Sequence, residues 1–249
     1  MKRLLTILPI LTLAIAGCYR EPYADAIISP NPAYVGEDIN FNNISSNTEY
    51  TEWEMGDGST STAFNVTHFY YDPGLYDVTL RAFGSKSDVN IASFVVEVIG
   101  SELKIVVQLW TPIDEPEGYY LEGASVILYP TLDDWKFETN PVAELYTNTA
   151  GECTFDGLSY QSYYVDVWEQ NHHNYWLAED DVEFIETQEL HGAYYHTFIA
   201  YVDYDPGTKK SASTSASRSA QKEWIMLQGP KGEKRDLKTN KISIPRERK

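Results

Sequence analysis

The sequence of 249 residues predicts an all-β protein with two tandem antiparallel β-sandwiches, an N-terminal lipoprotein signal and a flexible C-terminal tail. Three observations lead to this fold class. Short segments with alternating apolar and polar residues recur between residues 24 and 204, as expected of half-buried strands. Turn sequences containing Gly, Pro, Asn and Asp separate these segments. Residues 205–249 instead contain the low-complexity stretch SASTSASRSA, which predicts a flexible tail.

Residues 1–17 predict a signal peptide. Lys2 and Arg3 give it a positive start, and the apolar stretch that follows is too short for a membrane span. Its end, Ile15-Ala16-Gly17-Cys18, resembles a bacterial lipobox, which implies cleavage before Cys18 and lipid attachment to that residue. An ordinary secretory signal with a chance cysteine is the alternative. Residues 18–23 are then a linker from the lipidated cysteine.

The lipid anchor predicts a cell-envelope protein whose membrane partner is reached through acyl chains. Tyr19 follows the cysteine in place of an inner-membrane retention aspartate, which favours the outer membrane or the cell surface. Once Cys18 is used, Cys153 cannot form an internal disulfide, and its place in a strand pattern predicts a small buried hydrophobic residue.

The charge is distributed unevenly along the chain. Residues 21–204 contain 4 basic and 32 acidic residues, a net charge of −28, whereas residues 205–249 carry a net charge of +7. Binding to nucleic acid phosphates requires clustered Lys and Arg, so the acidic body argues against a nucleic-acid partner. High negative charge also serves solubility and mutual repulsion at a crowded surface.

Strand patterns define a first domain over residues 24–100. Ala24 to Ser29 form a short strand that ends at Pro30-Asn31-Pro32, and Ile39 and Phe41 alternate with polar residues in the next. The following strand, YTEWEM, places Trp53 and Met55 on one face. Next come VTHFYY, the turn Asp72-Pro73-Gly74, LYDVTLRAF with alternate residues facing inward, and DVNIASFVVEVI.

The Gly-Asp-Gly turn after the YTEWEM strand is the most informative motif. A phosphate loop is the alternative reading, but no helix opens there and no Lys follows. The motif and its surroundings resemble the PKD domain, an Ig-like sandwich of surface and secreted proteins. The residues that carry this resemblance are Trp53, Gly56, Asp57, Gly58, His68, Tyr70, Gly74, Tyr76, Val78 and Leu80. The resemblance implies a structural role for these residues, although Met55 stands where the family usually has Phe.

A second domain is predicted over residues 101–204. LKIVVQLW and GASVILY are strands, and a long aromatic strand, AYYHTFIAYVDY, ends the domain. Between them, TNTAGECTFDGLSYQSYYVDVWEQ resembles the transthyretin-like fold of carboxypeptidase regulatory and surface-adhesin repeat domains. The matching residues are Thr147, Gly151, Phe155, Gly157, Leu158, Tyr163, Val165 and Val167. In the basic tail, residues 205–249, KEWIMLQ and KISIP read as two short strand-like segments.

No metal, cofactor or catalytic group is expected. The side chains of His172 and His173 diverge in an extended backbone, with no further ligand at a metal-like spacing. The acidic runs 114–117 and 179–183 have carboxylates but lack the spacing of a defined calcium loop. No nucleophile elbow or zinc-protease helix is present, and both family resemblances point to non-catalytic modules. The sequence therefore predicts a protein that is not an enzyme.

Four aromatic residues of the second domain are candidate ligand-binding residues. If Val165 and Val167 face the core, strand alternation turns Tyr164 and Trp168 to the other face, and the same argument turns Trp110 and Tyr129 outward. Outward aromatic side chains suit sugar rings and protein partners. The alternative is that this face packs against the first domain, or under the loop that carries Trp135 and Trp176.

The predicted function is a non-catalytic binding, adhesion or protein-interaction module of an envelope lipoprotein. The alternative is a surface glycan-binding lipoprotein that uses the exposed aromatic residues of the second domain. The partner is accordingly an envelope protein or an extracellular glycan.

Overall fold

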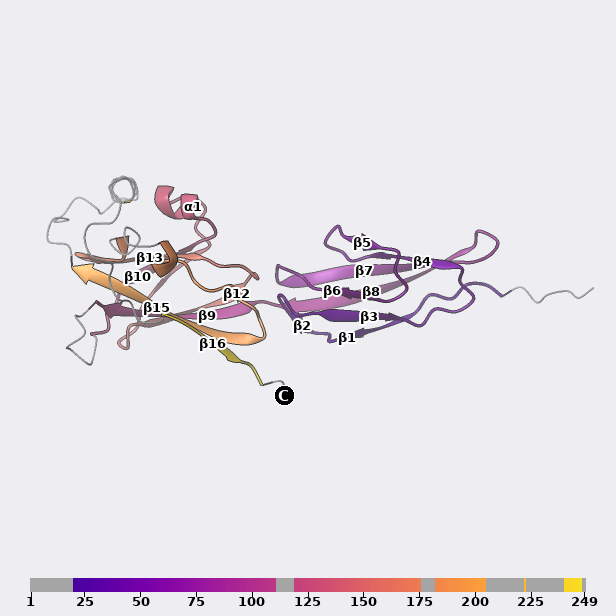
Figure 1. The fold of residues 1–249 in the computed structure, drawn as a ribbon, viewed down its shortest axis with the longest axis horizontal. Coiled ribbons are helices and arrows are strands. Elements are labelled where there is room, and N and C mark those ends of the chain that lie inside the picture. The colour runs from indigo at the N-terminus through magenta and orange to yellow at the C-terminus, as the bar shows by residue number, and fades with distance from the viewer. Residues whose placement is uncertain (1–19, 111–118, 176–181, 205–221, 223–239, 248–249) are drawn as a thin grey trace, which may run out of the picture.

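The computed structural model describes residues 20–110, 119–175, 182–204, 222 and 240–247. Figure 1 shows two β units arranged end to end, with β1 to β8 in one unit and β9 to β16 in the other. The all-β fold class is confirmed. The signal peptide and Cys18 lie outside the described residues. Over the ranges that are described, no helix is both long and apolar enough to cross a membrane.

The first unit is a sandwich of two sheets. The smaller sheet has the strand order β1 (Ala26–Ser29), β3 (Ile39–Asn43), β6 (Val66–His68). The larger sheet has the order β2 (Ala33–Tyr34), β8 (Val89–Ile99), β7 (Gly74–Phe83), β4 (Tyr50–Glu54), β5 (Thr60–Ser61). Most pairs are antiparallel, as predicted, but β2 pairs with β8 in parallel.

Alternation along the strands builds the core of the first sandwich. Val78, Leu80 and Ala82 of β7 are buried, and the residues between them are more exposed, as the sequence predicts. Trp53 of β4 lies opposite Leu80 and is fully buried, with its ring edge against Phe41 of the other sheet at a centroid distance of 5.7 Å. Trp53 therefore fills the space between the two sheets.

The second unit is one continuous sheet that folds back on itself. Its order is β11 (Ala143–Tyr146), β10 (Ser125–Tyr129), β13 (Tyr164–Glu169), β14 (His172–His173), β15 (Tyr194–Tyr204), β9 (Ser101–Leu109), β12 (Glu152–Leu158). The two-residue strand β14 pairs with both β13 and β15 and so joins the two layers. In contrast to the antiparallel prediction, β9 and β15 pair in parallel.

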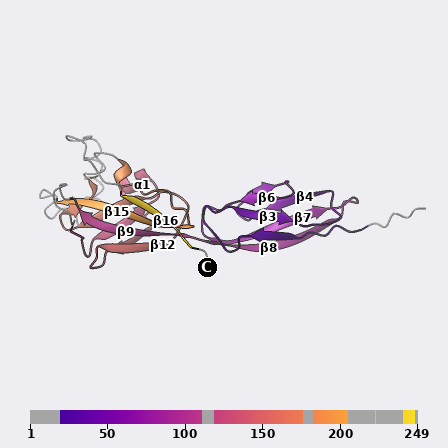
Figure 2. The same cartoon turned by 60° about the horizontal axis from the view of Figure 1, so that its bottom comes forward.

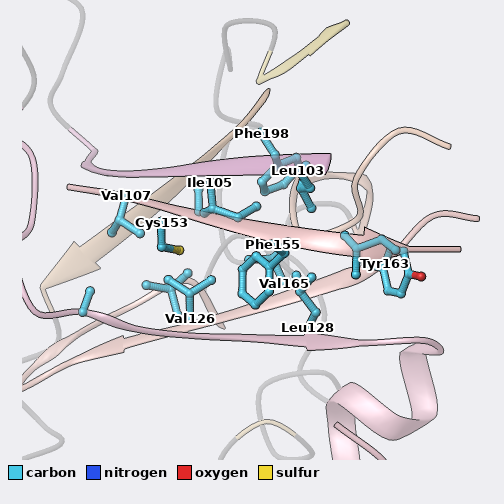
Figure 3. Close-up of a cluster of buried hydrophobic side chains, with 14 of the residues drawn as sticks. Leu103, Ile105, Val107, Val126, Leu128, Cys153, Phe155, Tyr163, Val165 and Phe198 are labelled. Carbon is cyan, nitrogen blue, oxygen red and sulfur yellow. The ribbon is translucent and has the colours of Figure 1, made fainter. Parts of the chain in front are cut away.

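The core of this unit lies between the two layers (Figure 3). Side chains from β9, β12 and β15 meet those from β10 and β13 there. Cys153 is among them, and burial raises the pKa of its thiol to about 12. A thiol with so high a pKa is not a nucleophile at neutral pH, which agrees with the predicted role as a small buried hydrophobic residue.

A second, smaller core covers the outer face of β10 and β13. Every residue of β10 is buried, because Val126 and Leu128 face the main core while Ile127 and Tyr129 face this smaller one. The covering element is the helix α1 (Leu132–Phe137), which supplies Trp135. The sequence predicts only a loop here, because a six-residue helix is too short to show a helical period.

The C-terminal part of the chain contributes a strand to the second unit. Lys241–Pro245 form β16, which pairs antiparallel with the first half of β15. Figure 2, like Figure 1, shows β16 beside β15. The expectation of a strand-like KISIP is therefore confirmed, and the expectation of a flexible tail is wrong for these five residues. Of the segment KEWIMLQ, only Lys222 is among the described residues.

The junction between the units is short and tightly packed. β8 ends at Ile99 and β9 begins at Ser101, which leaves Gly100 as the only linking residue. An added Cβ on Gly100 would lie 2.5 Å from the backbone of Gly157. Gly157 has φ +70° and sits where the register of β12 against β9 shifts. Glycine at position 100 therefore allows two backbones to touch where the units meet.

Tyr160 of the second unit contacts the first unit through its backbone and its ring. Its backbone N–H donates to the Tyr71 carbonyl at 2.7 Å, and its ring packs against the core of the first sandwich and stacks near Tyr71. Beside it, the Ser159 hydroxyl donates to Asp72 at 2.6 Å. Close to Tyr160, the Gly192 N–H donates to the Val35 carbonyl at 3.0 Å. These contacts oppose bending between the units.

Candidate functional site

The Gly-Asp-Gly turn of the first sandwich is a hydrogen-bonded structural element. Asp57 Oδ1 accepts from the Ser59 N–H at 2.9 Å and from the Ser59 hydroxyl at 2.6 Å. Its Oδ2 lies 2.7 Å from His68 Nε2. Because β5 follows the turn and His68 belongs to β6, this carboxylate links the two sheets. The serine hydroxyl donates to the aspartate, so it is not set up as a nucleophile activated by histidine.

The other motif residues also have structural contacts. The Tyr70 hydroxyl donates to the Met55 carbonyl at 2.7 Å, and the Tyr70 ring stacks on Tyr76 at a centroid distance of 3.9 Å. Gly56 has φ +84°, and a Cβ there would lie 2.9 Å from the Asp77 carbonyl oxygen. Trp53 is in the core. Gly58, at the end of the Gly-Asp-Gly turn, has φ +93°, and Gly74, at the end of the Asp72-Pro73-Gly74 turn, has φ +159°.

We expect the Asp57 network to give the first sandwich a specific pH dependence. Burial raises the pKa of Asp57, but hydrogen bonds from Ser59 and the pairing with His68 outweigh it, so the pKa falls below its ordinary value of 3.8. The carboxylate then stabilises the fold above pH 3.8, and this contribution is lost as the pH falls through the lowered pKa. At pH 7, Asp57→Asn should lower the free energy of unfolding by roughly 1 kcal/mol.

The check is urea unfolding of both proteins at pH 7 and at several pH values below 3.8. The difference between wild type and variant should shrink as the wild-type carboxylate becomes protonated. Glu97→Gln on the exposed face of β8 is the matched control and should leave the difference near zero. A difference that stays constant down to the acid limit would contradict the assigned role of the carboxylate.

The four candidate aromatic residues of the second domain do not form one exposed surface. Tyr129 is 2% exposed and lies in the smaller core beneath α1, so its expected outward exposure is wrong. Tyr164 and Trp168 are half-buried and pack against that same core. Trp168 also stacks on His173, with ring centroids 5.5 Å apart. For these three residues the alternative prediction is therefore correct, because the segment that carries Trp135 covers this face of the sheet.

Trp110 belongs to a different group at the end of the second sandwich that is remote from the junction. Its backbone N–H donates to the Val202 carbonyl at 2.8 Å. Its half-buried ring meets the Tyr201 ring edge-on, with ring centroids 5.4 Å apart. Tyr120 bridges to Gln108 of β9, and Tyr119 accepts a hydrogen bond from Leu109 through its carbonyl. Tyr119 and Tyr120 are 65% and 56% exposed. We call Trp110, Tyr119 and Tyr120 the distal aromatic surface.

The histidine pair has structural partners. His172 Nδ1 lies 3.0 Å from Glu169 Oε2, and the His173 ring is buried and stacks on Tyr175 at 4.4 Å. Within the ranges that the structure covers, no group of three or more His, Cys, Asp or Glu residues has the arrangement of a metal site. The acidic run 114–117 and residues 179–181 of the second run lie outside those ranges.

A buried charged cluster that no sequence pattern predicts lies under α1. Lys222 is fully buried there, with Asp166 of β13 and Glu138 at the end of α1 as its carboxylate partners. Its three contributors are far apart in the chain, so no local motif signals the cluster. The only available signal was Asp166 itself, which alternation places on the covered face of β13 rather than in solvent.

Comparison with known proteins supports the assignment of the first sandwich. Residues 19–98 match the family model of the PKD domain, so the predicted PKD domain is confirmed. The PKD1 domain of Vibrio anguillarum Epp is similar, with 20% identity over 32% of this chain and 94% of that one and a TM-score of 0.28. The PKD1 domain of the Vibrio cholerae metalloprotease PrtV has 25% identity, 32% and 98% coverage, and a TM-score of 0.28.

A longer alignment reaches beyond the first sandwich. A carbohydrate-binding module of the β-sandwich superfamily aligns with 14% identity over 56% of this chain and 85% of that one, with a TM-score of 0.31.

Proposed function

We propose that this protein is a lipid-anchored envelope protein that presents the distal end of its second sandwich to a protein partner, as a non-catalytic adhesion or interaction module. The observation that carries the proposal is that the N-terminal entry of the chain and the distal aromatic surface lie at opposite ends of the two sandwiches. The chain enters the first sandwich at the end remote from the junction, where Pro22 packs against Gly84. β9 begins at the junction with Ser101, and the distal aromatic surface lies beside its other end, at Gln108 and Leu109.

The stiffness of the junction supports this presentation role. A single linking residue and the contacts of Tyr160, Ser159 and Gly192 hold the two sandwiches in one line. Arg246, just after β16, adds a further contact, because its guanidinium lies 5.2 Å from the ring centroid of Tyr34 in the first sandwich. A stiff pair of domains on the proposed Cys18 anchor holds a binding surface at a fixed distance from the membrane.

The distal aromatic surface has the chemistry of a recognition site. Tyrosine and tryptophan offer large apolar areas with a polar group, and they are enriched where proteins meet partners. Tyr119 and Tyr120 are neighbours in sequence and exposed, and Tyr120 pairs with Gln108 of β9. A backbone held by this pairing limits the loss of conformational entropy when a partner binds.

Glycan binding is the second candidate function, and the same surface favours it. Exposed tyrosine rings beside Trp110 can stack on sugar rings, whereas the other predicted candidates, Tyr129, Tyr164 and Trp168, are largely covered. A glycan site would accordingly use Trp110, Tyr119 and Tyr120.

The test combines anchoring and binding in the full-length protein on intact cells. Cys18→Ala should release the protein from the membrane fraction or block its maturation, and an unchanged membrane fraction would refute the anchor. The double variant Tyr119→Ala/Tyr120→Ala should lose a crosslinked envelope protein that the wild type captures. Tyr23→Ala, an equally exposed tyrosine at the opposite end, should retain it. Crosslinking that is the same in all variants would refute the role of the surface.

A glycan array separates the two candidates. Binding of the wild type to a defined glycan, lost in the double variant and kept in Tyr23→Ala, would replace the protein-partner proposal by the glycan-binding one.

A further inference from the structure

The buried cluster under α1 brings one amine and two carboxylates together. Lys222 Nζ lies 2.6 Å from Asp166 Oδ2 and 3.2 Å from Glu138 Oε1, and it donates to the Trp135 carbonyl at 3.0 Å. The side chains of Lys222, Asp166 and Glu138 are 0%, 1% and 3% exposed. The contact between Lys222 and Asp166 spans 56 residues of sequence. The three groups are therefore sealed from solvent in one place.

Aromatic rings enclose the amine. Its nitrogen lies 4.6 Å from the ring centroid of Trp135, 5.0 Å from that of Tyr175 and 5.4 Å from that of Tyr129. Trp135 and Tyr175 meet edge to face, which closes the enclosure. Among the described residues, the polar groups that contact the amine are the two carboxylates and the Trp135 carbonyl.

The surroundings weaken the case for a simple ion pair. Two carboxylates lie beside one amine in this enclosure, and burying ionised groups is unfavourable in a medium of low polarity. Asp166 Oδ1 is buried and has no hydrogen-bond partner in the part of the chain that the structure describes. An amine attacks a carboxyl carbon only in its neutral form, and the Asp166 oxygen 2.6 Å from Nζ is placed to take the ammonium proton.

We propose that Lys222 and Asp166 join through an intramolecular amide bond, with Glu138 as the group that moves protons. In the neutral pair, the amine nitrogen attacks the Asp166 carboxyl carbon. Asp166 is the acceptor because its oxygen lies nearer the amine than that of Glu138 does. Glu138 takes a proton from the attacking nitrogen and passes a proton to the departing hydroxyl.

The reaction balances without an oxidant or a co-reactant. One N–C bond forms and one C–O bond breaks, and an amine proton leaves with the carboxyl hydroxyl as one water molecule. Fixed proximity supplies the driving force that free carboxylic acids and amines lack, because preorganised groups react as if at very high concentration. The product also replaces two buried ionisable groups with one neutral amide.

The test is peptide mapping of the full-length protein after denaturation and digestion with trypsin. No Lys or Arg lies between Lys136 and Lys209, so Asp166 falls in the fragment 137–209. A free Lys222 allows cleavage after residue 222, whereas an acylated one leaves the fragment 219–231 intact. We expect a branched species of these two fragments, lighter than their sum by one water molecule. Fragmentation by tandem mass spectrometry should place the link at Asp166 and not at Glu138.

Variants define the roles of the three groups. Lys222→Arg keeps a positive charge but should abolish the branched species completely, as should Asp166→Ala. Asp166→Asn should still form the bond, releasing ammonia in place of water. Glu138→Gln should delay formation, so that freshly made protein contains mostly the linear fragments. Lys104→Arg, at a half-exposed ion pair with Glu152, is the matched control and should leave the branched species unchanged.

The wild-type map decides the question even if a variant fails to fold. Recovery of the linear fragments alone would mean that the cluster is only an ion pair, which overturns the proposal. A link located at Glu138, or one that persists in Asp166→Ala, would also overturn the assignment.

Discussion

Replacing Trp53 with alanine is expected to destabilise the PKD sandwich by about 3–5 kcal/mol, which is of the order of the whole stability of a small domain. The indole is fully buried between the two sheets, against Phe41 and opposite Leu80. Its removal leaves a cavity that the flanking strands cannot close without breaking their ladder. Chemical denaturation followed by far-UV circular dichroism measures the effect, because Trp53 is the only tryptophan between residues 24 and 100 and its fluorescence is lost in the variant.

Leu75→Ala is the control for this variant. Leu75 lies on the same sheet but is 73% exposed, so the change should alter the free energy of unfolding by less than about 0.5 kcal/mol. Equal effects of Trp53→Ala and Leu75→Ala would mean that the indole does not fill the core.

A second large effect is expected at the junction. Gly100→Ala places a Cβ 2.5 Å from the backbone of Gly157, and two backbones cannot yield as the tip of a flexible side chain can. The strain should cost at least about 1–3 kcal/mol and separate Ser101 from Leu158, its partner in the ladder. Small-angle X-ray scattering should then report a less extended average shape, because the domains gain freedom to bend.

Ile99→Ala tests the same place without the clash. This neighbouring side chain is 38% exposed, so its truncation should leave the scattering profile unchanged. A Gly100→Ala protein with wild-type stability and wild-type scattering would show that the junction tolerates a side chain and is looser than the backbone contact implies.

Strand periodicity predicts most of the fold, because in-and-out alternation is a local property. The inward residues of β7 and the motif around Asp57 follow directly from their spacing. Alternation does not predict whether an outward side chain is exposed to solvent, since that depends on which other segments cover the strand. Alternation assigned Tyr129 to the correct face of β10, but the cover over that face comes from Trp135 on a helix too short to have a visible period.

The charged cluster and the junction lie beyond local patterns for a related reason. Lys222 is one of many lysines in a basic segment, and nothing nearby distinguishes it from its neighbours. Its burial depends on residues 56 and 87 positions away. Tyr160 likewise sits between two predicted strands, and only the approach of the first sandwich gives its ring a packing role.

The position of β16 has a consequence for how the protein forms. β15 pairs with β9 near the start of the second unit and with β16 near the end of the chain, so the sheet joins segments that are synthesised far apart in time. Contacts of such high sequence separation slow folding. The PKD sandwich needs only residues that emerge earlier, and domains generally fold as units from the N-terminus. Until translation reaches β16, the first half of β15 therefore has an unpaired edge, which is exposed to pairing with other chains.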